Sequence, residues 1–337
     1  EPPEEAALLD GIRAVCAALA SAYPDETSCS EEVRDWLFDL PRLLEDWEHP
    51  ELAFHLHCPA RGQVRFSCLD AAPVVRPVLH AFARTVLMSA TLQPWDAFEA
   101  SVGLSRDGRA ARLLGSADWL RAAFRVGVDA RIDTRYRARE RFHNALATVL
   151  GETARSHPGQ TVAFFPSYRY AQVLLERLQF HFPDLRCALQ PRHLALEEQE
   201  AFLEQSLVLD DLLLLILGSR FSEGIDALGG RIRRALVVGP ALPEVNGLQK
   251  AREQRVCGGR EAAFHQVYRI PGMRRISQAL GRLVRDPDQH AEVLLVGQRF
   301  LEPAYQQLLP EYLQPVFSLE SREDFVNCWL QSTGDGP

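Results

Sequence analysis

Apolar residues recur at every third or fourth position through the first 50 residues of the chain. This spacing predicts amphipathic helices over residues 6–22, 33–40 and 43–47, with a break at Tyr23-Pro24-Asp25. Short amphipathic helices bury their apolar faces only against a partner. We therefore expect residues 1–50 to be the end of a helical domain whose beginning lies outside this chain.

The pattern changes to strict alternation after residue 53. Phe54, Leu56 and Cys58 alternate with polar neighbours, and the alternation resumes from Val64 after the turn residues 59–62. Two alternating runs that flank a Pro- and Gly-containing turn predict a β-hairpin.

Short apolar runs alternate with helical segments from residue 84 onward. The runs predict strands at Thr85–Met88, Thr161–Phe165, Leu212–Leu217, Ala235–Val238 and Glu292–Val296. Helices are expected at about 135–156, 168–181, 194–206, 245–264, 272–284 and 301–308. Strands that alternate with helices predict an α/β domain over residues 51–337, with a mostly parallel sheet flanked by helices.

Small or polar residues follow the predicted strands. They are Ser89-Ala-Thr-Leu92, Pro166-Ser-Tyr168, Gly218-Ser-Arg-Phe-Ser-Glu-Gly-Ile-Asp226 and Gly239-Pro-Ala-Leu-Pro243. Each alone is typical of an ordinary turn between a strand and a helix. Ligands of parallel sheets bind at the carboxyl ends of the strands, so four such segments predict a binding crevice there.

A polar stripe marks the helix predicted over residues 272–284. Gln278, Arg282 and Arg285 are spaced by four and three residues, which predicts one helical face, and Gly281 lies beside them. Two guanidinium groups one turn apart suit a ligand with several charged oxygens, such as a triphosphate. Taken alone, the stripe is more typical of a solvated basic face.

Composition limits the choice of partners. The chain has 337 residues and a net charge of −8, so phosphate contacts have to be local rather than spread over the surface. Its seven scattered cysteines favour reduced thiols and a cytoplasmic location, and no apolar run is long enough for a membrane. His55, His57, Cys58 and Cys68 are possible metal ligands, but the histidines and cysteines alternate between strand faces, so we expect no metal site.

The four segments and the polar stripe together resemble a known family. Ser89–Leu92, Phe164–Tyr168, Gly218–Asp226 and Gln278–Arg285 are similar, in sequence and order, to motifs III, IV, V and VI of the XPD/DinG group of superfamily 2 DNA helicases. The resemblance covers about residues 51–310. It implies a RecA-like second motor domain over residues 51–337 and 5′-to-3′ DNA unwinding driven by ATP hydrolysis. It also implies that residues 1–50 are the helical tail of an arch-like domain inserted in the first motor domain.

The resemblance also assigns roles to single residues. Arg282 and Arg285 would reach the γ-phosphate, and Gln278 would position the phosphate or the attacking water. Glu223, Gly224, Asp226 and Gly281 would line the nucleotide site, and Ser89 and Thr91 would couple the two motor domains. The residues implied to contact single-stranded DNA are Ser167, Tyr168, Arg220 and Ser222.

The half of the nucleotide site that holds a phosphate loop is not in this sequence. The chain has neither G-x-x-x-x-G-K-[ST] nor Asp-Glu-x-His. We therefore expect a C-terminal piece that is inactive alone and binds ATP and Mg²⁺ jointly with the first motor domain of the same protein. An iron–sulfur cluster is possible in the full-length protein but not in this chain. The alternative is a non-catalytic, motor-like docking module for nucleic acid or protein.

Overall fold

The computed structural model describes most of the chain. The described residues are 5–22, 31–57, 65–104, 110–115, 117–156, 161–219 and 228–331. They divide into two compact units: unit 1 comprises Glu1–Arg112 and Glu244–Ala263, and unit 2 comprises Leu113–Pro243 and Phe264–Pro337. The boundary expected near residue 50 stays a prediction.

Unit 1 consists of helices and one hairpin. Its elements are α1 (Glu5–Ala22), α2 (Glu31–Glu48), β1 (Phe54–His57), β2 (Arg65–Cys68), α3 (Ala72–His80), α4 (Trp95–Ser101), α10 (Gly247–Arg255) and most of α11 (Gly259–Phe264). β1 and β2 pair antiparallel, which confirms the predicted hairpin. The Trp47 ring of α2 packs against Phe54 and Phe66 of the hairpin, with centroids 5.2 and 4.8 Å away.

The strand predicted at Thr85–Met88 is wrong. Residues 84–89 have no regular secondary structure, and no described strand pairs with them. Val86 and Met88 are 79% and 87% exposed. A β-branched, apolar run forms a strand only where a neighbouring strand satisfies its backbone, and the described residues supply none here.

Unit 2 contains a parallel sheet of seven strands in the order β5-β6-β4-β7-β8-β3-β9. The strands are β3 (Phe124–Asp129), β4 (Thr161–Phe165), β5 (Cys187–Leu189), β6 (Leu212–Ile216), β7 (Arg234–Val238), β8 (Ala291–Val296) and β9 (Phe317–Leu319). This arrangement confirms the predicted α/β class. β3, β5 and β9 were not predicted.

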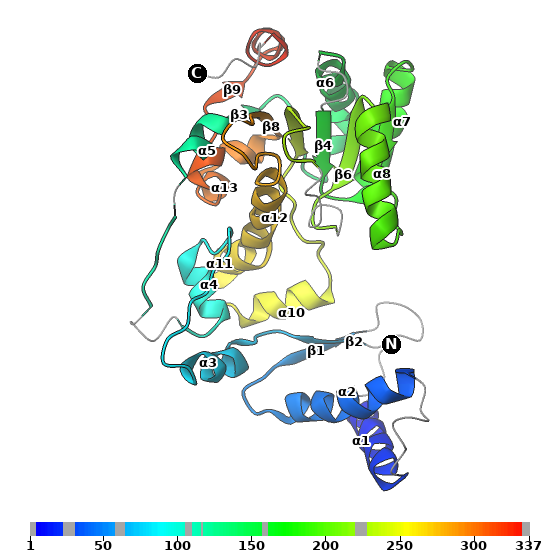
Figure 1. Cartoon of the computed structure of the whole chain (residues 1–337), viewed down its shortest axis with the longest axis vertical. Coiled ribbons are helices and arrows are strands. Elements are labelled where there is room, and N and C mark those ends of the chain that lie inside the picture. Colours follow the sequence, from blue (N-terminus) through cyan, green and yellow to red (C-terminus); the bar gives the residue numbers. More distant parts are fainter. Residues whose placement is uncertain are drawn as a thin grey trace. The chain divides into compact units, whose positions relative to one another are not determined.

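Helices and turns cover the sheet of unit 2 (Figure 1). They are α5 (Asp118–Ala123), η1 (Arg139–Phe142), α6 (His143–Ser156), α7 (Tyr168–His181), α8 (Leu196–Leu209), η3 (His265–Arg269), α12 (Ile270–Leu280), η4 (Gln298–Leu301), α13 (Pro303–Gln306), η5 (Glu311–Leu313), α14 (Arg322–Asp324) and η6 (Phe325–Leu330). The helix predicted over 168–181 is confirmed to the residue, whereas the helix expected over 245–264 is interrupted between α10 and α11.

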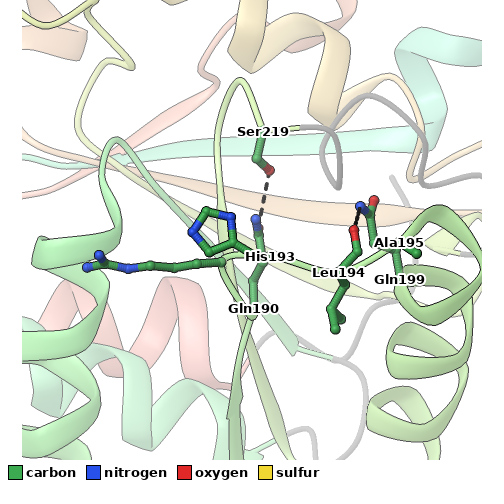
Figure 2. A pocket seen from close by; sticks show the side chains of 7 residues that line it. Gln190, His193, Leu194, Ala195, Gln199 and Ser219 are labelled. Atoms are coloured by element: carbon green, nitrogen blue, oxygen red, sulfur yellow. Dashed lines mark hydrogen bonds between the residues drawn. The ribbon is translucent and has the colours of Figure 1, made fainter. Parts of the chain in front are cut away.

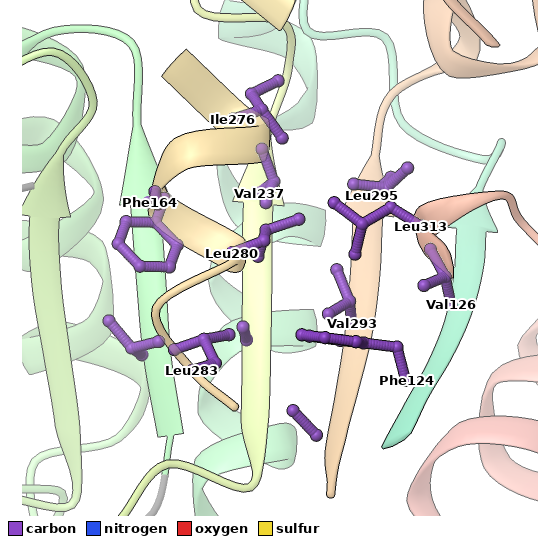
Figure 3. Close-up of a cluster of buried hydrophobic side chains, with 14 of the residues drawn as sticks. Phe124, Val126, Phe164, Val237, Ile276, Leu280, Leu283, Val293, Leu295 and Leu313 are labelled. Carbon is purple, nitrogen blue, oxygen red and sulfur yellow. The ribbon is translucent and has the colours of Figure 1, made fainter. Parts of the chain in front are cut away.

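The strands are apolar on both faces because helices cover both. In β4, Val162 and Phe164 belong to one buried cluster with side chains of α5, α8 and α12, part of which is drawn in Figure 3. Ala163 and Phe165 point the other way, into a second cluster with α6, α7 and η6. Continuous burial explains why β4, β6, β7 and β8 each contain at least four consecutive apolar residues.

Candidate functional site

The carboxyl end of β4 places Ser167 and Tyr168 at the start of α7. The Ser167 hydroxyl accepts the backbone N–H of Tyr170 at 3.4 Å and so caps the helix. Tyr168 is half-buried, and the guanidinium carbon of Arg192 lies 4.2 Å from the centroid of its ring. A cation over an aromatic ring at this separation is attractive, so the two side chains hold each other in place.

A cavity of about 490 Å³ lies at the carboxyl ends of β5 and β6 (Figure 2). It is lined by Gln190, Arg192, His193, Leu194, Ala195, Gln199 and Ser219. The buried Gln190 side chain joins the two strand ends, because its Oε1 accepts the Ile216 N–H at 2.8 Å and the Ser219 hydroxyl at 3.2 Å. With an exposed arginine and histidine on a wall fixed by buried amides, the cavity suits an anionic ligand.

Gly218 is a position where the fold requires glycine. Its φ is +74°, and a Cβ there would lie 2.8 Å from Nε of Arg275. Arg275, from α12, also donates to the carbonyl oxygen of Ala241 at 3.3 Å. Arg275 therefore packs against the segments that follow both β6 and β7, a position that sequence reasoning missed.

Several expected site residues lie outside the described part of the chain. They are Arg220, Ser222, Glu223, Gly224 and Asp226. Their assigned roles stay predictions.

The second group of expected residues surrounds the end of α12. The helix ends at Leu280, so the prediction that Gln278, Arg282 and Arg285 share one helical face is wrong: both arginines lie beyond the helix. Gln278 and Arg285 are exposed, whereas Arg282 is half-buried. A Cβ on Gly281 would lie 3.1 Å from the Ser277 carbonyl oxygen and 3.5 Å from the Tyr312 hydroxyl.

Residues 281–285, which contain Arg282 and Arg285, lie near the amino ends of β7 and β8. The carbonyl of Leu283 accepts the N–H of Gly230, four residues before β7, and the Arg285 N–H donates to Gln289, two residues before β8. Ser167 and Tyr168 follow the carboxyl end of β4 instead. Ser167 and Tyr168 therefore lie at the carboxyl ends of the strands, whereas Arg285 lies near their amino ends.

Ser89 and Thr91 belong to unit 1. The Ser89 hydroxyl accepts the Thr91 N–H at 3.3 Å and lies 3.5 Å from the Thr91 hydroxyl, which forms a local turn. Ser89 is exposed and Thr91 is half-buried.

Among the described residues, no group of three or more His, Cys, Asp or Glu side chains is placed so that it could hold a metal ion. His57 and Cys58 of the alternative metal site lie where side chains are not described. No described helix combines the length and the apolar character that crossing a bilayer requires.

The comparison with protein families decides the type of domain. The family described as "Helicase C-terminal domain" matches residues 150–316. The match includes the segments Phe164–Tyr168, Gly218–Asp226 and Gln278–Arg285. Residues 150–316, just under half of the chain, therefore match a helicase C-terminal domain.

Curated relatives of this helicase domain are DNA helicases. The chain is 26% identical over 274 residues to the general transcription and DNA repair factor IIH helicase subunit XPD/RAD3 of Saccharomyces cerevisiae, an alignment that covers 74% of this chain and 34% of the relative. It is 23% identical over 205 residues to the ATP-dependent DNA helicase chl1 of Aspergillus clavatus, covering 50% of this chain and 28% of the relative. The chain thus spans about a third of the length of the curated relatives it matches.

The fold agrees with this family. An apo structure of XPD superimposes with a TM-score of 0.62 and 17% sequence identity over 90% of this chain and 61% of the XPD chain. The similarity to an XPD/DinG-like helicase that motifs III to VI imply is therefore confirmed, and the α/β domain has the fold of a helicase motor domain.

Proposed function

We propose that this chain is the C-terminal half of an ATP-dependent DNA helicase with 5′-to-3′ polarity. It would supply arginine fingers to a nucleotide bound jointly with a first motor domain, and part of the track for single-stranded DNA. The match of residues 150–316 to the helicase C-terminal domain and the names of the relatives support the activity. The polarity rests on the resemblance to the XPD/DinG group.

The end of α12 carries the nucleotide half of this proposal. Seven of the eleven residues of α12 are buried, yet Gln278 near its end is exposed, and the exposed Arg285 follows five residues after the helix. Side chains at such a position are accessible to a ligand held by another domain. The planar guanidinium groups of Arg282 and Arg285 match phosphate oxygens in pairs, as an arginine finger requires.

The residues present fit the charge of a triphosphate but not the coordination of its metal ion. Among the described residues, no carboxylate or imidazole cluster is available for Mg²⁺. We therefore assign the phosphate loop and the Mg²⁺ ligands to the first motor domain. Gln278 would orient the γ-phosphate or the attacking water, and Glu223, Gly224, Asp226 and Gly281 would complete the site.

The carboxyl edge carries the DNA half of the proposal. Tyr168 offers an aromatic ring held by Arg192, beside a polar cavity. Aromatic rings next to guanidinium groups are typical of surfaces that bind single strands, because bases stack and phosphates are neutralised. Ser167, Arg220 and Ser222 would add contacts to phosphates. Ser89 and Thr91 would couple nucleotide hydrolysis in one motor domain to movement of the other.

Substitution of the arginines tests the proposal in the protein that includes the first motor domain. Arg282→Ala and Arg285→Ala should each lower DNA-stimulated ATP turnover by about three to five orders of magnitude, the range that arginine fingers contribute. Arg282→Lys should restore little, since an ammonium group lacks the planar fork. The matched control is Arg177→Ala, which removes an exposed arginine of α7 and should leave turnover unchanged.

Thermal unfolding of the same variants separates catalysis from stability. Near-normal turnover in both alanine variants, with lowered melting temperatures, would refute the arginine-finger assignment and favour a docking module. The isolated chain should show no ATP hydrolysis above background, since the phosphate loop is not part of it.

A further inference from the structure

An arginine-rich segment connects β3 to α6 and lies at the carboxyl ends of the strands. Residues 131–141 contain five arginines, two acidic residues and Tyr136. Arg137, Arg141 and Tyr136 are exposed. The segment lies outside the sequence segments that resemble helicase motifs III to VI.

Buried contacts hold the segment firmly against the sheet. Arg131 donates to both carboxylate oxygens of the buried Asp129, at 2.8 and 2.6 Å, and its backbone N–H donates to one of them. Thr134 is buried against two glycines that follow β7 and β8: a Cβ on Gly239 or on Gly297 would lie 2.7 Å from its hydroxyl oxygen. The segment therefore crosses the ends of these strands in a defined path, and its exposed side chains have fixed starting points.

Arg139 lies between two tyrosine rings. Its guanidinium carbon is 4.6 Å from the centroid of Tyr136 and 4.7 Å from that of Tyr170. Tyr170 is buried and packs on Phe165 and His143, and burial raises its pKa to about 12. Tyr136 lies at the other end of this stack and is 76% exposed.

The Tyr136 ring is thus presented to solvent in a held orientation. Single exposed aromatic residues are common and by themselves indicate nothing. Here, however, one ring face is covered by Arg139, and the remainder is open beside the exposed Arg137 and Arg141. No ion pair involving Arg137 or Arg141 occurs among the described residues. A held ring with available cations around it provides both a stacking platform and phosphate contacts.

The stack adjoins the DNA-contacting residues proposed above. Tyr168 and Tyr170 are two residues apart on α7, so their side chains point to different sides of the helix. Tyr168 meets Arg192 beside the cavity, whereas Tyr170 meets Arg139. Two tyrosine–arginine contacts therefore flank the start of α7 on the same edge of the sheet.

We propose that Tyr136, Arg137, Arg139 and Arg141 form a further contact site for single-stranded nucleic acid. Tyr136 stacks on a base, Arg139 holds the ring in place, and Arg137 and Arg141 neutralise phosphates. The site lengthens the track beyond motifs IV and V, and it rests on the proposed function of this edge of the sheet.

The test is binding of the full chain to a fluorescein-labelled thymidine 12-mer, measured by anisotropy over a range of salt concentrations. Tyr136→Ala should weaken binding by about 5-fold to 100-fold, the range for loss of one base–aromatic stack, while Tyr136→Trp should retain affinity. Arg137→Ala with Arg141→Ala should reduce the slope of log K against log salt by about 0.7 for each phosphate that is no longer neutralised. Arg233→Ala is the matched control, an exposed arginine directly before β7 at the opposite edge.

An oligonucleotide of abasic sites separates the two roles. It keeps the phosphates but offers no base, so Tyr136→Ala should have no effect on it while the double arginine variant still weakens binding. Affinities of the Tyr136 and arginine variants equal to that of Arg233→Ala, or an equal effect of Tyr136→Ala on both oligonucleotides, would overturn the proposal. A wild-type chain that does not bind the 12-mer would overturn it too.

The same titration separates this proposal from the motif-based track. Ser167→Ala with Tyr168→Ala tests the contacts assigned by motif IV. If that variant loses affinity and the Tyr136 variants do not, the additional site fails while the proposed function stands. If only the Tyr136 and Arg137 variants lose affinity, the site stands and the motif IV assignment fails.

Discussion

Glu292 is expected to contribute more to the stability of unit 2 than any exposed ion pair. It lies on β8 in register with Arg125 of β3 and Arg234 of β7. One carboxylate oxygen accepts from Arg125 at 2.9 Å and the other from Arg234 at 2.9 Å. The Arg234 side chain is fully buried, and burial lowers its pKa below the ordinary value although the Glu292 carboxylate opposes this.

The charge on Arg234 sets the size of the effect. Glu292→Gln keeps the shape of the side chain but removes the carboxylate charge that balances the buried guanidinium of Arg234, and breaking a buried ion pair typically costs about 3–5 kcal/mol. The amide oxygen still accepts one hydrogen bond, and the Trp329 ring 4.8 Å from the guanidinium carbon of Arg234 remains, so the lower end of the range applies. Arg125 is 37% exposed and adds less than about 1 kcal/mol. A loss of about 3 kcal/mol should lower the melting temperature of a unit of this size by about 6–12 °C.

Urea unfolding of the wild type and of Glu292→Gln measures this loss, and amide hydrogen exchange in β7 and β8 assigns it to unit 2. The matched control is Glu311→Gln, whose carboxylate pairs with Arg121 at 3.0 Å while both side chains are more than 70% exposed. The control should change the free energy of unfolding by less than about 1 kcal/mol.

Equal stabilities of the Glu292 and Glu311 variants would refute the reasoning. A second variant makes the test sharper: Arg234→Met combined with Glu292→Leu removes both buried charges. It should be less destabilising than Glu292→Gln alone, because no uncompensated charge remains. A double variant that is the less stable of the two would show that the pair contributes net stabilisation beyond charge compensation.

Three further substitutions follow from the structure. Burial, and after it the positive charge of Arg139, lowers the pKa of His143 below its usual 6.5. As pH drops through 6.5 the unfolded chain binds a proton at this histidine before the folded chain does, so the free energy of unfolding falls. His143→Gln should therefore reduce the difference between the urea midpoints at pH 7.5 and 5.5, and an unchanged difference would contradict this. Gly239→Ala places a Cβ 2.7 Å from the Thr134 hydroxyl at a φ of +72° and should cost about 1–3 kcal/mol in urea unfolding, whereas a neutral effect would show that the loop shifts freely. Trp329→Phe removes a 2.9 Å hydrogen bond to a threonine hydroxyl of α6 and should cost about 0.5–1.5 kcal/mol, which a wild-type urea midpoint would contradict.

The central strands were predictable because they are buried on both faces, so that consecutive residues are apolar. β4, β6, β7 and β8 each contain four or five consecutive apolar residues. β3 was missed because Arg125 and Gly127 interrupt its apolar residues, and in the structure Arg125 is balanced by Glu292 from the neighbouring strand. β5 and β9 contain three residues each and exist through pairing, which no local pattern reveals.

The candidate site was predictable where it depends on strand ends and not where it depends on packing across strands. Ser167 and Tyr168 follow an obvious strand, whereas Arg192 reaches Tyr168 only because β5 lies two strands away in the sheet. The helix predicted over residues 272–284 ends earlier, at Leu280. Periodicity alone gives no weight to Gly281 and cannot show that the Leu283 carbonyl accepts the N–H of the distant Gly230. The Tyr136 stack depends in the same way on α7 meeting a segment some 30 residues earlier.

The division of the chain has a practical consequence for producing its parts separately. The units alternate along the sequence, so three peptide links join them, at Arg112–Leu113, Pro243–Glu244 and Ala263–Phe264. A protease that cleaves one link, or even two, leaves some part of one unit covalently attached to the other. A fragment that starts at residue 113 still includes residues 244–263 of the other unit, and the last link lies inside α11. Isolating the sheet-containing unit therefore requires a designed linker from Pro243 to Phe264 rather than a simple truncation.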